Sequence, residues 1–407
     1  MKTIRPSRRA AVVGVGQIPF KTRYIEKNYQ ELSFEVAKAA LDHAKLRKDD
    51  IDSAVYAIYS DMLLRQQTSD NMVHDYLGLT GKPSLRVSAG ASTGAFGVRA
   101  AVAEVMSGMS DIVLVLSVQK SGDLINTANG HRGEGIMMSE SITHDVIWQH
   151  PYTPFPPAAW GLILNAHMER YGAPSPEQCA KAALKNHQNS HGNPNAQFKY
   201  NLTLEDILYS RIIAWPTTMY ECCAFAEGAA AVILASEHVA SKITDKPIWI
   251  TGAGTAVEAS SPDMLGESYG RLLATRHAAD RAYEMSGMKR PADELDVLEV
   301  HDIFSGLEIL QYEELGLCPI GQGGRLLDEG SVHKTGKHPV NPSGGRVACG
   351  HIAGPSEVYS VGEVALQLRE EAVGRQVPIR KGKGLVSTVG GPAASLGAVL
   401  VMDRNPL

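Results

Sequence analysis

The sequence predicts an α/β protein built from two duplicated halves, 1–243 and 244–407, with a loop domain inserted into the first half at about 121–213. Three observations predict this class. A pattern of strand, helix, acidic turn and strand occurs twice in the same order. A turn of small residues followed by a helical pattern also occurs twice. Glycine is abundant, at 39 of 407 residues, which is typical of many tight turns between strands and helices.

The first repeated unit opens each half. "AAVVGVGQIPF" at 10–20 and "PIWITGAGTAV" at 247–257 are apolar runs that contain Gly, and they predict buried strands. Each run precedes a helical pattern with closely spaced Ala, and small side chains let a helix pack close to a sheet. An acidic turn follows at 48–52 and again at 292–296, and each turn leads into another apolar strand. The order of elements is therefore the same in both halves.

The second repeated unit combines a turn of small residues with a helix. "SLRVSAGASTG" at 84–94 leads into "SDIVLVLSV", and "NPSGGRVACGHIAG" at 341–354 leads into "GLVSTVGG". A repeat of about 200 residues is too long for a solenoid unit, so we expect two similar domains related by a pseudo-twofold axis. We place their junction near Ser241–Pro247, where charge and proline interrupt the pattern.

The segment at about 121–213 has no counterpart in the second half. It includes "WQHPYTPFPPAAWG" at 148–161, which is rich in proline and aromatic residues. An insertion of this size on an α/β core usually covers a functional site, so we expect it to cover the substrate. A packing excursion or a dimer arm is the alternative.

Composition narrows the class of protein. A net charge of -5 gives no reason to expect nucleic acid or an anionic membrane as the main partner. The longest apolar runs are too short to span a bilayer, and Gly14 and Gly16 interrupt any signal-peptide core after the basic N-terminus. The five cysteines show no metal-ligand spacing, so we expect reduced thiols, no metal site and a cytoplasmic location.

The turn at 88–94 has the setting of a reaction centre. A strand, a tight turn and a helix N-terminus often present a nucleophile, because free backbone N–H groups there stabilise negative charge. The turn "SAGASTG" contains no cysteine and no serine with a visible activating partner. The sequence therefore predicts a site whose nucleophile is not obvious.

Three motifs of the second half resemble the thiolase superfamily, in the branch that includes the sterol-carrier-protein-linked thiolases. They are "VHDIFSGLEILQYEELGLCPIGQGGRLL" at 300–327, "NPSGGRVACGHIAG" at 341–354 and "STVGGPAASLGAVLVM" at 387–402. The likeness covers nearly the whole chain. It implies a thiolase fold with five layers in the order αβαβα, an acyl-CoA substrate, coenzyme A as a co-substrate and no permanently bound cofactor.

The resemblance implies roles for two histidines. His301 looks like the histidine that helps bind the thioester oxygen as an oxyanion, and His351 looks like the base that activates the nucleophilic cysteine. Both roles agree with elementary chemistry. A donor held in a dry pocket lowers the barrier by roughly 3 kcal/mol, and a neutral imidazole near pH 7 shuttles protons readily.

Two loops are implied as substrate-binding elements. The loop with Asn341 and Ser343 resembles the one that shapes the pocket before the base. Gly390 and Gly391 of "VGG" resemble the glycine loop whose backbone N–H groups form the other oxyanion hole. We expect these four residues to contact the substrate or the developing oxyanion.

The family's cysteines are absent at the positions that match. The acyl-accepting cysteine aligns with Ala91, and the proton-shuttling cysteine aligns with Ile303 in this branch or with Thr388 in the other thiolases. In one explanation, Ala91 replaces a native cysteine. In the second, another residue is the nucleophile, with Cys349 as the best-placed thiol, although a small buried filler is the simpler interpretation of that residue. In the third, the reaction needs no covalent acyl intermediate.

Three functions follow from these alternatives. Our first expectation is thiolytic, CoA-dependent cleavage of a bulky or aromatic β-ketoacyl-CoA in a degradative pathway, as in the similar benzoylsuccinyl-CoA thiolases. The second is a retro-aldol lyase acting on a β-hydroxyacyl-CoA, as in similar steroid side-chain aldolases that carry Tyr where this chain has His301 and His351. The third is a non-catalytic thiolase-like subunit that binds acyl-CoA.

The resemblance also implies an assembly. We expect a homodimeric core, and a possible small partner subunit with a zinc ribbon and an OB-type domain. Any zinc would belong to that partner, because this chain has no metal-spaced cysteines. The pair Cys222–Cys223, which is similar to a pair in the steroid side-chain aldolases, we interpret as packing.

Overall fold

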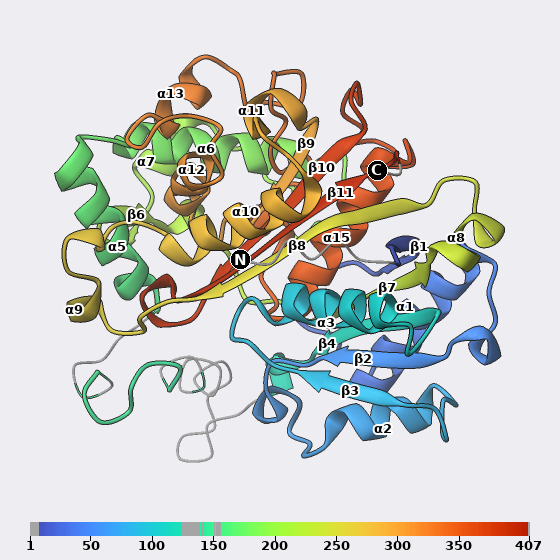
Figure 1. Ribbon diagram of the computed structural model, residues 1–407. Helices are drawn as coiled ribbons and strands as arrows, with labels where there is room; N and C mark the ends of the chain where they lie inside the picture. The colour runs from blue at the N-terminus through green and yellow to red at the C-terminus, as the bar shows by residue number, and fades with distance from the viewer. Residues whose placement is uncertain (1–7, 124–138, 140–141, 150, 152–155, 406–407) are drawn as a thin grey trace.

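A single nine-stranded sheet runs through the molecule in the order β3-β2-β4-β7-β1-β8-β11-β10-β9 (Figure 1). The computed structural model describes residues 8–123, 139, 142–149, 151 and 156–405. The strands of this sheet are β1 (Ala10–Gln17), β2 (Ser53–Ala57), β3 (Ser84–Val87), β4 (Ile112–Gln119), β7 (Gly228–Ser236), β8 (Ile248–Val257), β9 (Val297–Val300), β10 (Lys383–Gly390) and β11 (Leu396–Asp403).

The sheet consists of two equivalent halves. In the first, β2 is parallel to β3 and β4, and β7 is antiparallel to β4 and β1. In the second, β9 is parallel to β10, β11 is antiparallel to β10 and β8, and a parallel bridge from Leu298 to Val340 takes the place of β3. Within the described part of the nine-stranded sheet, β1 and β8 join the halves through the register pairs Ala11–Trp249 and Val12–Ile248. Four strands of each half therefore correspond one to one, and the bridge at Val340 occupies the place of the fifth.

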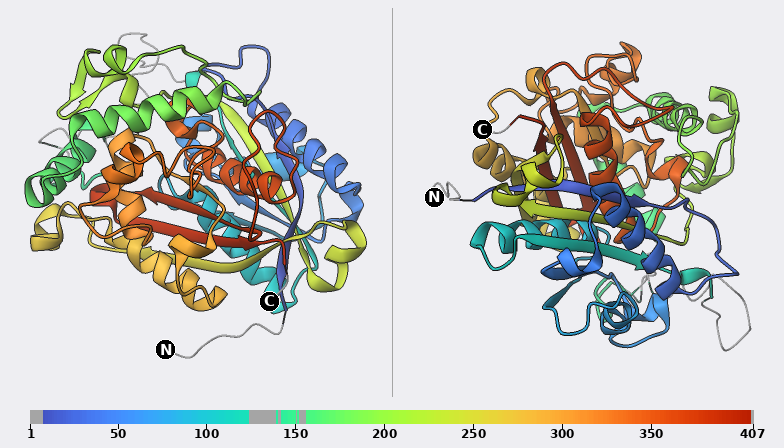
Figure 2. Two further views of the ribbon diagram at one scale, coloured as in Figure 1. Left: turned by 90° about the horizontal axis from the view of Figure 1, so that it is seen from above. Right: turned by 90° about the vertical axis from the view of Figure 1, so that its right-hand side faces the viewer.

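The helices complete five layers. α3 (Thr93–Ser107) and α15 (Pro355–Leu368) lie between the two halves of the sheet, α1 (Tyr29–Ala44) covers the outer face of the first half, and α10 (Leu273–Ser286) covers the outer face of the second (Figures 1 and 2). Three apolar clusters alternate with these layers, and the central one joins residues of both middle helices to both halves of the sheet. The predicted thiolase fold is confirmed.

Close packing of the outer helices depends on matched glycines. A β-carbon added at Gly16 of β1 would lie 2.0 Å from the carbonyl oxygen of Val36 in α1. One added at Gly254 of β8 would lie 2.0 Å from the carbonyl oxygen of Ala278 in α10. The same close approach of helix to strand occurs in both halves, because the duplicated sequence keeps glycine on the strand and small residues on the helix.

The inserted segment packs on the second half. Its described elements are α5 (Pro156–Tyr171), α6 (Pro176–Ser190), α7 (Leu204–Leu208) and the small sheet of β5 (Ile212–Ala214) and β6 (Thr217–Thr218). Helix α6 contacts three helices of the second half, α12 (Ser305–Glu314), α13 (Gly323–Asp328) and α14 (Gly345–Cys349). Residues 150 and 152–155 of the predicted proline-rich stretch at 148–161 lie outside the described residues.

The remaining elements are short. They are the helices α2 (Ser69–Tyr76), α8 (Glu237–Ile243), α9 (Pro262–Leu265), α11 (Pro291–Glu294), α12 (Ser305–Glu314), α13 (Gly323–Asp328) and α14 (Gly345–Cys349), and the 3-10 turns Lys48–Asp50, Asp61–Leu64, Ser121–Asp123, Met219–Glu221, Gly266–Ser268 and Pro392–Ala394. Among the described residues, no helix has both the length and the apolar character needed to cross a membrane.

Candidate active site

A cavity of about 510 Å³ lies where the turns of both halves meet the inserted segment. Its lining includes Gly90, Ala91, His351, Gly390 and Gly391. Inserted residues, from Thr143 and His144 to Phe198, Tyr200 and Ile213, form much of the remaining wall. The insertion thus lines the cavity, as a substrate-covering element would.

Ala91 lies at the start of α3, in the turn that the sequence singled out. Thr93 Oγ1 donates to the carbonyl of Gly90 at 2.6 Å and accepts from the backbone N–H of Ala89 at 2.8 Å, which closes the turn. A β-carbon added at Gly390 would lie 3.1 Å from Ala91 Cβ. The predicted nucleophile turn and the predicted glycine loop are therefore in contact.

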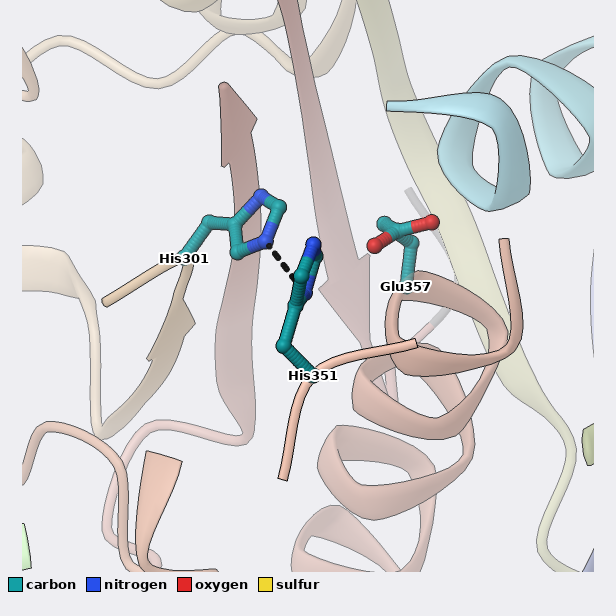
Figure 3. Close-up of side chains that lie close together, drawn as sticks. All are labelled: His301, His351 and Glu357. Atoms are coloured by element: carbon teal, nitrogen blue, oxygen red, sulfur yellow. Dashed lines mark hydrogen bonds between the residues drawn. The ribbon is translucent and has the colours of Figure 1, made fainter. Parts of the chain in front are cut away.

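His301 and His351 come together in the interior. Nε2 of His301 lies 3.3 Å from Nδ1 of His351 (Figure 3). His301 is 3% exposed and His351 is 9% exposed. His301 directly follows β9, and His351 follows α14. The two predicted catalytic histidines are thus one hydrogen-bonded pair, with His351 on the cavity side.

The order of protons in this pair follows from its outer hydrogen bond. The backbone N–H of Val389 points at Nδ1 of His301 at 3.4 Å, so Nδ1 is an acceptor and the proton of a neutral His301 is on Nε2. That proton is donated to Nδ1 of His351, which leaves the proton of a neutral His351 on its Nε2. Burial, joined by the nearby Arg346, lowers the pKa of His351 to about 3, and burial also holds the pKa of His301 well below its usual range. Both rings are therefore neutral near pH 7.

A short segment of the first half supports both histidine-bearing loops. The backbone N–H of Cys223 donates to the carbonyl of Ile303 at 2.9 Å. The N–H of His351 donates to the carbonyl of Ala224 at 2.9 Å, and Ala226 N–H donates back to His351 at 3.2 Å. The "ECCAFA" motif therefore joins the two loops through its backbone. The structural role that we predicted for Cys222–Cys223 thus includes holding these loops together.

Glu357 is a third member of this cluster, and the sequence analysis did not identify it. Its Oε2 accepts from the backbone N–H groups of Gly94 at 3.1 Å and Gly354 at 2.7 Å, at the starts of α3 and α15. Its Oε1 is buried and has no hydrogen-bond partner among the described residues. Figure 3 shows one carboxylate oxygen directed toward the His351 ring. Burial raises the pKa of this carboxyl to about 8.

His301, His351 and Glu357 each place one possible metal-ligand atom within 4.8 Å of the others. A metal-bound histidine usually donates its second N–H to an acceptor. The neighbour of His301 Nδ1 is a donor, the N–H of Val389, so the ring is held with its proton on the nitrogen that faces His351. The donor set favours a proton-carrying cluster over a metal site.

The predicted loop residues Asn341 and Ser343 do not reach the cavity. Asn341 Nδ2 donates to Glu308 Oε2 at 2.7 Å, and Asn341 Oδ1 accepts from the N–H of Val300 at 2.8 Å. Ser343 Oγ donates to Glu299 Oε2 at 2.8 Å. Both side chains are buried and hydrogen-bonded, so they hold the end of β9 in place, and neither is among the residues that line the cavity.

Cys349 is also behind the wall. Its Sγ donates to the carbonyl of Ser343 at 3.1 Å and accepts from Asn193 at 3.4 Å, and burial raises the pKa of this thiol to about 12. A buried thiol with so high a pKa is a poor nucleophile. The interpretation as a small buried filler agrees with this geometry.

The remaining positions of interest differ in their setting. Ile303 lines the cavity, whereas Thr388 is buried, and its Oγ1 lacks a hydrogen-bond partner in the described part of the chain. Cys222 and Cys223 also line the cavity. Burial raises the pKa of Cys222 to about 12, and its Sγ donates to the carbonyl of Thr218 at 3.3 Å. That thiol is therefore not poised to react.

Comparison with known proteins agrees with this fold and site. The family descriptions "Thiolase, N-terminal domain" and "Thiolase C-terminal domain-like" match residues 10–204 and 256–403. "Acetyl-CoA acetyltransferase" of Methanothermobacter thermautotrophicus is 32% identical over 401 residues, covering 98% of this chain and 100% of the relative. "Sterol carrier protein 2" of Bos taurus is 34% identical over 379 residues, covering 91% of this chain and 68% of the relative.

Two further matches have different names. "Benzoylsuccinyl-CoA thiolase subunit BbsB" of Thauera aromatica is 28% identical over 380 residues, and the match covers 91% of each chain. The solved structure titled "Ltp2-ChsH2(DUF35) aldolase" superposes with a TM-score of 0.79 at 21% identity and covers 97% of each chain, which is a likeness of fold. With two domain matches and full-length relatives above 30% identity, the chain belongs to the thiolase superfamily, in the branch of the sterol-carrier-protein-linked thiolases.

Proposed function

We propose that this chain cleaves the bond between the α and β carbons of a bulky β-hydroxyacyl-CoA by retro-aldol chemistry. The family and the cavity support carbon–carbon bond chemistry on an acyl-CoA. The observation that carries the finer proposal is Ala91, which lines the cavity next to the glycine loop, at the position that aligns with the family's acyl-accepting cysteine.

The other thiols do not replace that cysteine. All five cysteines fall within the described residues. Cys349 is hydrogen-bonded behind the cavity wall. Cys222 and Cys223 belong to the "ECCAFA" motif, whose backbone supports the loops that carry the two histidines. Thiolysis through an acyl-enzyme needs a thiolate at the base of α3. Of the alternatives that the sequence leaves open, the geometry therefore favours retro-aldol cleavage, which needs no thiolate.

Retro-aldol cleavage needs one donor and one acceptor. A base takes the proton of the β-hydroxyl, the C–O bond becomes a carbonyl, and the α–β bond breaks with its electron pair moving into a thioester enolate. A proton then returns to the α carbon. No free coenzyme A and no water are consumed, so coenzyme A enters only as part of the substrate.

The histidine pair supplies the donor in this proposal. The hydrogen-bond order places a proton on His351 Nε2, and His351 lines the cavity. A fixed N–H at the enolate oxygen stabilises the charge that develops there. His301 holds the ring and its tautomer from behind. We therefore propose His351 as an oxyanion donor, which differs from its expected role as a base for cysteine.

Glu357 is the acceptor in this proposal, and it takes the β-hydroxyl proton through one bridging water, because its side chain is buried behind the cavity wall and does not line the cavity. An efficient general base has a pKa near the working pH, and the pKa of about 8 meets that condition better than the pKa of about 3 of His351. Its second oxygen is held by two backbone N–H groups, which fixes the carboxylate and leaves Oε1 free.

The contrast between Ala91→Cys and Ala91→Ser tests this proposal. We expect neither variant to raise cleavage of a β-hydroxyacyl-CoA, because the reaction uses no nucleophile at this position. Ala91→Cys should instead bring thiolysis of the matching β-ketoacyl-CoA. Retro-aldol cleavage that is absent in the wild type and needs the new thiol would contradict the proposal. Thiolysis by the wild type would support the acetyltransferase-like alternative that the relatives' names suggest.

We also propose an assembly for the active protein. A homodimeric core fits the free edge of the sheet at β3, where Leu85 is 48% exposed. A partner subunit is supported by the names of two similar proteins, one called a subunit and the other a DUF35-containing aldolase, and its zinc ribbon is what the family resemblance implies. Affinity capture from the source organism, followed by mass spectrometry, tests the partner. Full activity of the isolated chain would show that the partner is not required.

A further inference from the structure

The wall of the cavity carries no ionic side chain among the described residues. No Asp, Glu, Lys or Arg contributes to it. Apart from small residues, it is formed by aromatic rings, aliphatic side chains, thiols and histidines. The aromatic members are Tyr59, Trp160, Phe198, Tyr200, Tyr220, Phe225 and Phe304.

Part of this wall is a preformed aromatic surface. The rings of Phe198 and Tyr200 are stacked, with centroids 5.0 Å apart and planes at 19°. The ring of Tyr220 meets Tyr200 at 6.2 Å in an edge-to-face arrangement. His187 Nε2 donates to the carbonyl of Tyr220 at 3.2 Å, which ties α6 to this group. Flat rings can pack on such a surface without first ordering it.

Two of the three histidines of the wall, His187 and His351, do not supply a dependable positive charge. Burial lowers the pKa of both His187 and His351, and both rings are neutral near pH 7. Arg346, the cation closest in sequence to His351, is buried behind the wall with Glu299 at 3.8 Å and does not line the cavity. A carboxylate inside the cavity would lose its water and gain no Lys or Arg partner among the described lining residues, which is strongly unfavourable.

We infer that the acyl group of the substrate is uncharged and bears a ring, and that an acyl-CoA with a second, free carboxylate is rejected by this cavity. The inference rests on the proposed function in one respect, namely that the acyl group occupies this cavity. It separates this chain from its relative named for benzoylsuccinyl-CoA, because a benzoylsuccinyl group carries a free carboxylate.

Binding of three unreactive thioesters tests the inference. 3-Phenylpropanoyl-CoA carries a neutral ring, benzylsuccinyl-CoA carries the same ring and one carboxylate, and butanoyl-CoA carries neither. None has a β-hydroxyl, so calorimetry reports binding without turnover. We expect 3-phenylpropanoyl-CoA to bind at least tenfold more tightly than each of the other two. Equal affinities for the two ring-bearing thioesters, or no binding of any thioester, would overturn the inference.

A charge placed in the wall should change the preference. Ile213 lines the cavity, and its neighbour in β5, Ile212, is 56% exposed and does not. We expect Ile213→Arg to narrow the affinity ratio of 3-phenylpropanoyl-CoA to benzylsuccinyl-CoA at least fivefold, and Ile212→Arg to leave it unchanged. Met219→Lys, at a second lining position, repeats the test if Ile213→Arg does not fold. An unchanged ratio in both lining variants would contradict the inference.

These outcomes are independent of the reaction type. If the wild type discriminates against the carboxylate but cleaves no β-hydroxyacyl-CoA, the inference stands and the retro-aldol proposal fails. If retro-aldol cleavage occurs and the two ring-bearing thioesters bind equally, the proposal of function stands and this inference fails.

Discussion

Nε2 of His301 lies 3.3 Å from Nδ1 of His351, although the two residues are 50 positions apart in the sequence. The contact joins the loop after β9 to the turn before α15, and the N–H of Val389 fixes its polarity from the other side. The pair is therefore a directed chain of donors that ends at the cavity. Its direction, more than the identity of its residues, decides what chemistry it supports.

Loss of His301 and loss of His351 should each reduce catalysis, for different reasons. His351→Ala removes the donor itself, and we expect kcat for β-hydroxyacyl-CoA cleavage to fall roughly 10²–10³-fold. His301→Ala leaves the donor in place but unsupported, so its effect should be smaller. His238→Ala, on the exposed surface of α8, is the matched control. Steady-state kinetics with folding checked by circular dichroism gives the answer, and full activity of both site variants would mean that the site lies elsewhere.

Glu357→Gln should separate function from folding. We expect kcat to fall at least about 100-fold, as for loss of a general base. In the wild type, activity should rise with pH through about 8, because the carboxyl must lose its proton to act as a base, and the variant should lack this rise. A pH–rate profile measures both. Wild-type activity that falls as pH rises through this range would contradict the assigned role.

The same substitution should lower activity without lowering the stability of the folded protein at pH 8. The folded state raises the pKa of Glu357 from 4.5 to about 8, so the folded state binds this proton more tightly than the unfolded state. The stability that protonated Glu357 contributes is fully present below about pH 4.5, and it is lost as the pH rises through about 8. Glu357→Gln should therefore be at least as stable as wild type at pH 8 by thermal unfolding. A large loss of stability there would make Glu357 a structural cap instead.

A thiol introduced at Ala91 reports on the cavity. In Ala91→Cys, we expect iodoacetamide to label residue 91, and an acyl-CoA to protect it, because the position lines the cavity beside His351. Cys349 is an internal control that should stay unlabelled, since it is buried. Peptide mass spectrometry after timed labelling distinguishes the two sites. Labelling at 91 that acyl-CoA does not slow would place the substrate elsewhere.

The duplicated glycines should be equally intolerant of substitution. In both Gly16→Ala and Gly254→Ala, a methyl group would lie 2.0 Å from a helix carbonyl oxygen. Overpacking of this kind costs about 1–3 kcal/mol or more, so each variant should unfold at a lower urea concentration than wild type. If one variant is destabilised and the other is not, the two helix–strand contacts are not equivalent.

The β3 edge predicts a dimer that can be disrupted. Light scattering of the wild type should give twice the chain mass of 43.8 kDa. Leu85→Lys puts a charge on this exposed edge strand and should shift the protein toward monomer. A wild type that remains monomeric at micromolar concentration would contradict the proposed core.

The sequence was sufficient for the architecture because the duplication repeats local signals. Gly16 and Gly254 mark the same helix–strand contact, and Ala91 and Gly390 could be assigned to turns from their small-residue neighbours. Motif order also located His301 and His351. These features depend on residues close in sequence or on a pattern that occurs twice.

The sequence could not supply the contacts that cross the fold. Glu357 looks like an ordinary residue in the first turn of a helix, and only the approach of Gly94 from the other half reveals its place beside the histidines. Asn341 and Ser343 carry suggestive polar groups, yet buried Glu308 and Glu299 bind both of them. Polar side chains in a motif can serve either substrate or scaffold, and the partner across the fold decides which.

The central claim is that carbon–carbon cleavage proceeds here without a thiol, and product analysis with 3-hydroxy-3-phenylpropanoyl-CoA tests it most directly. Mass spectrometry should find benzaldehyde and acetyl-CoA in equal amounts, at a rate that does not depend on added coenzyme A. The account is contradicted if this thioester is left intact, while 3-oxo-3-phenylpropanoyl-CoA is cleaved to benzoyl-CoA and acetyl-CoA only when free coenzyme A is present.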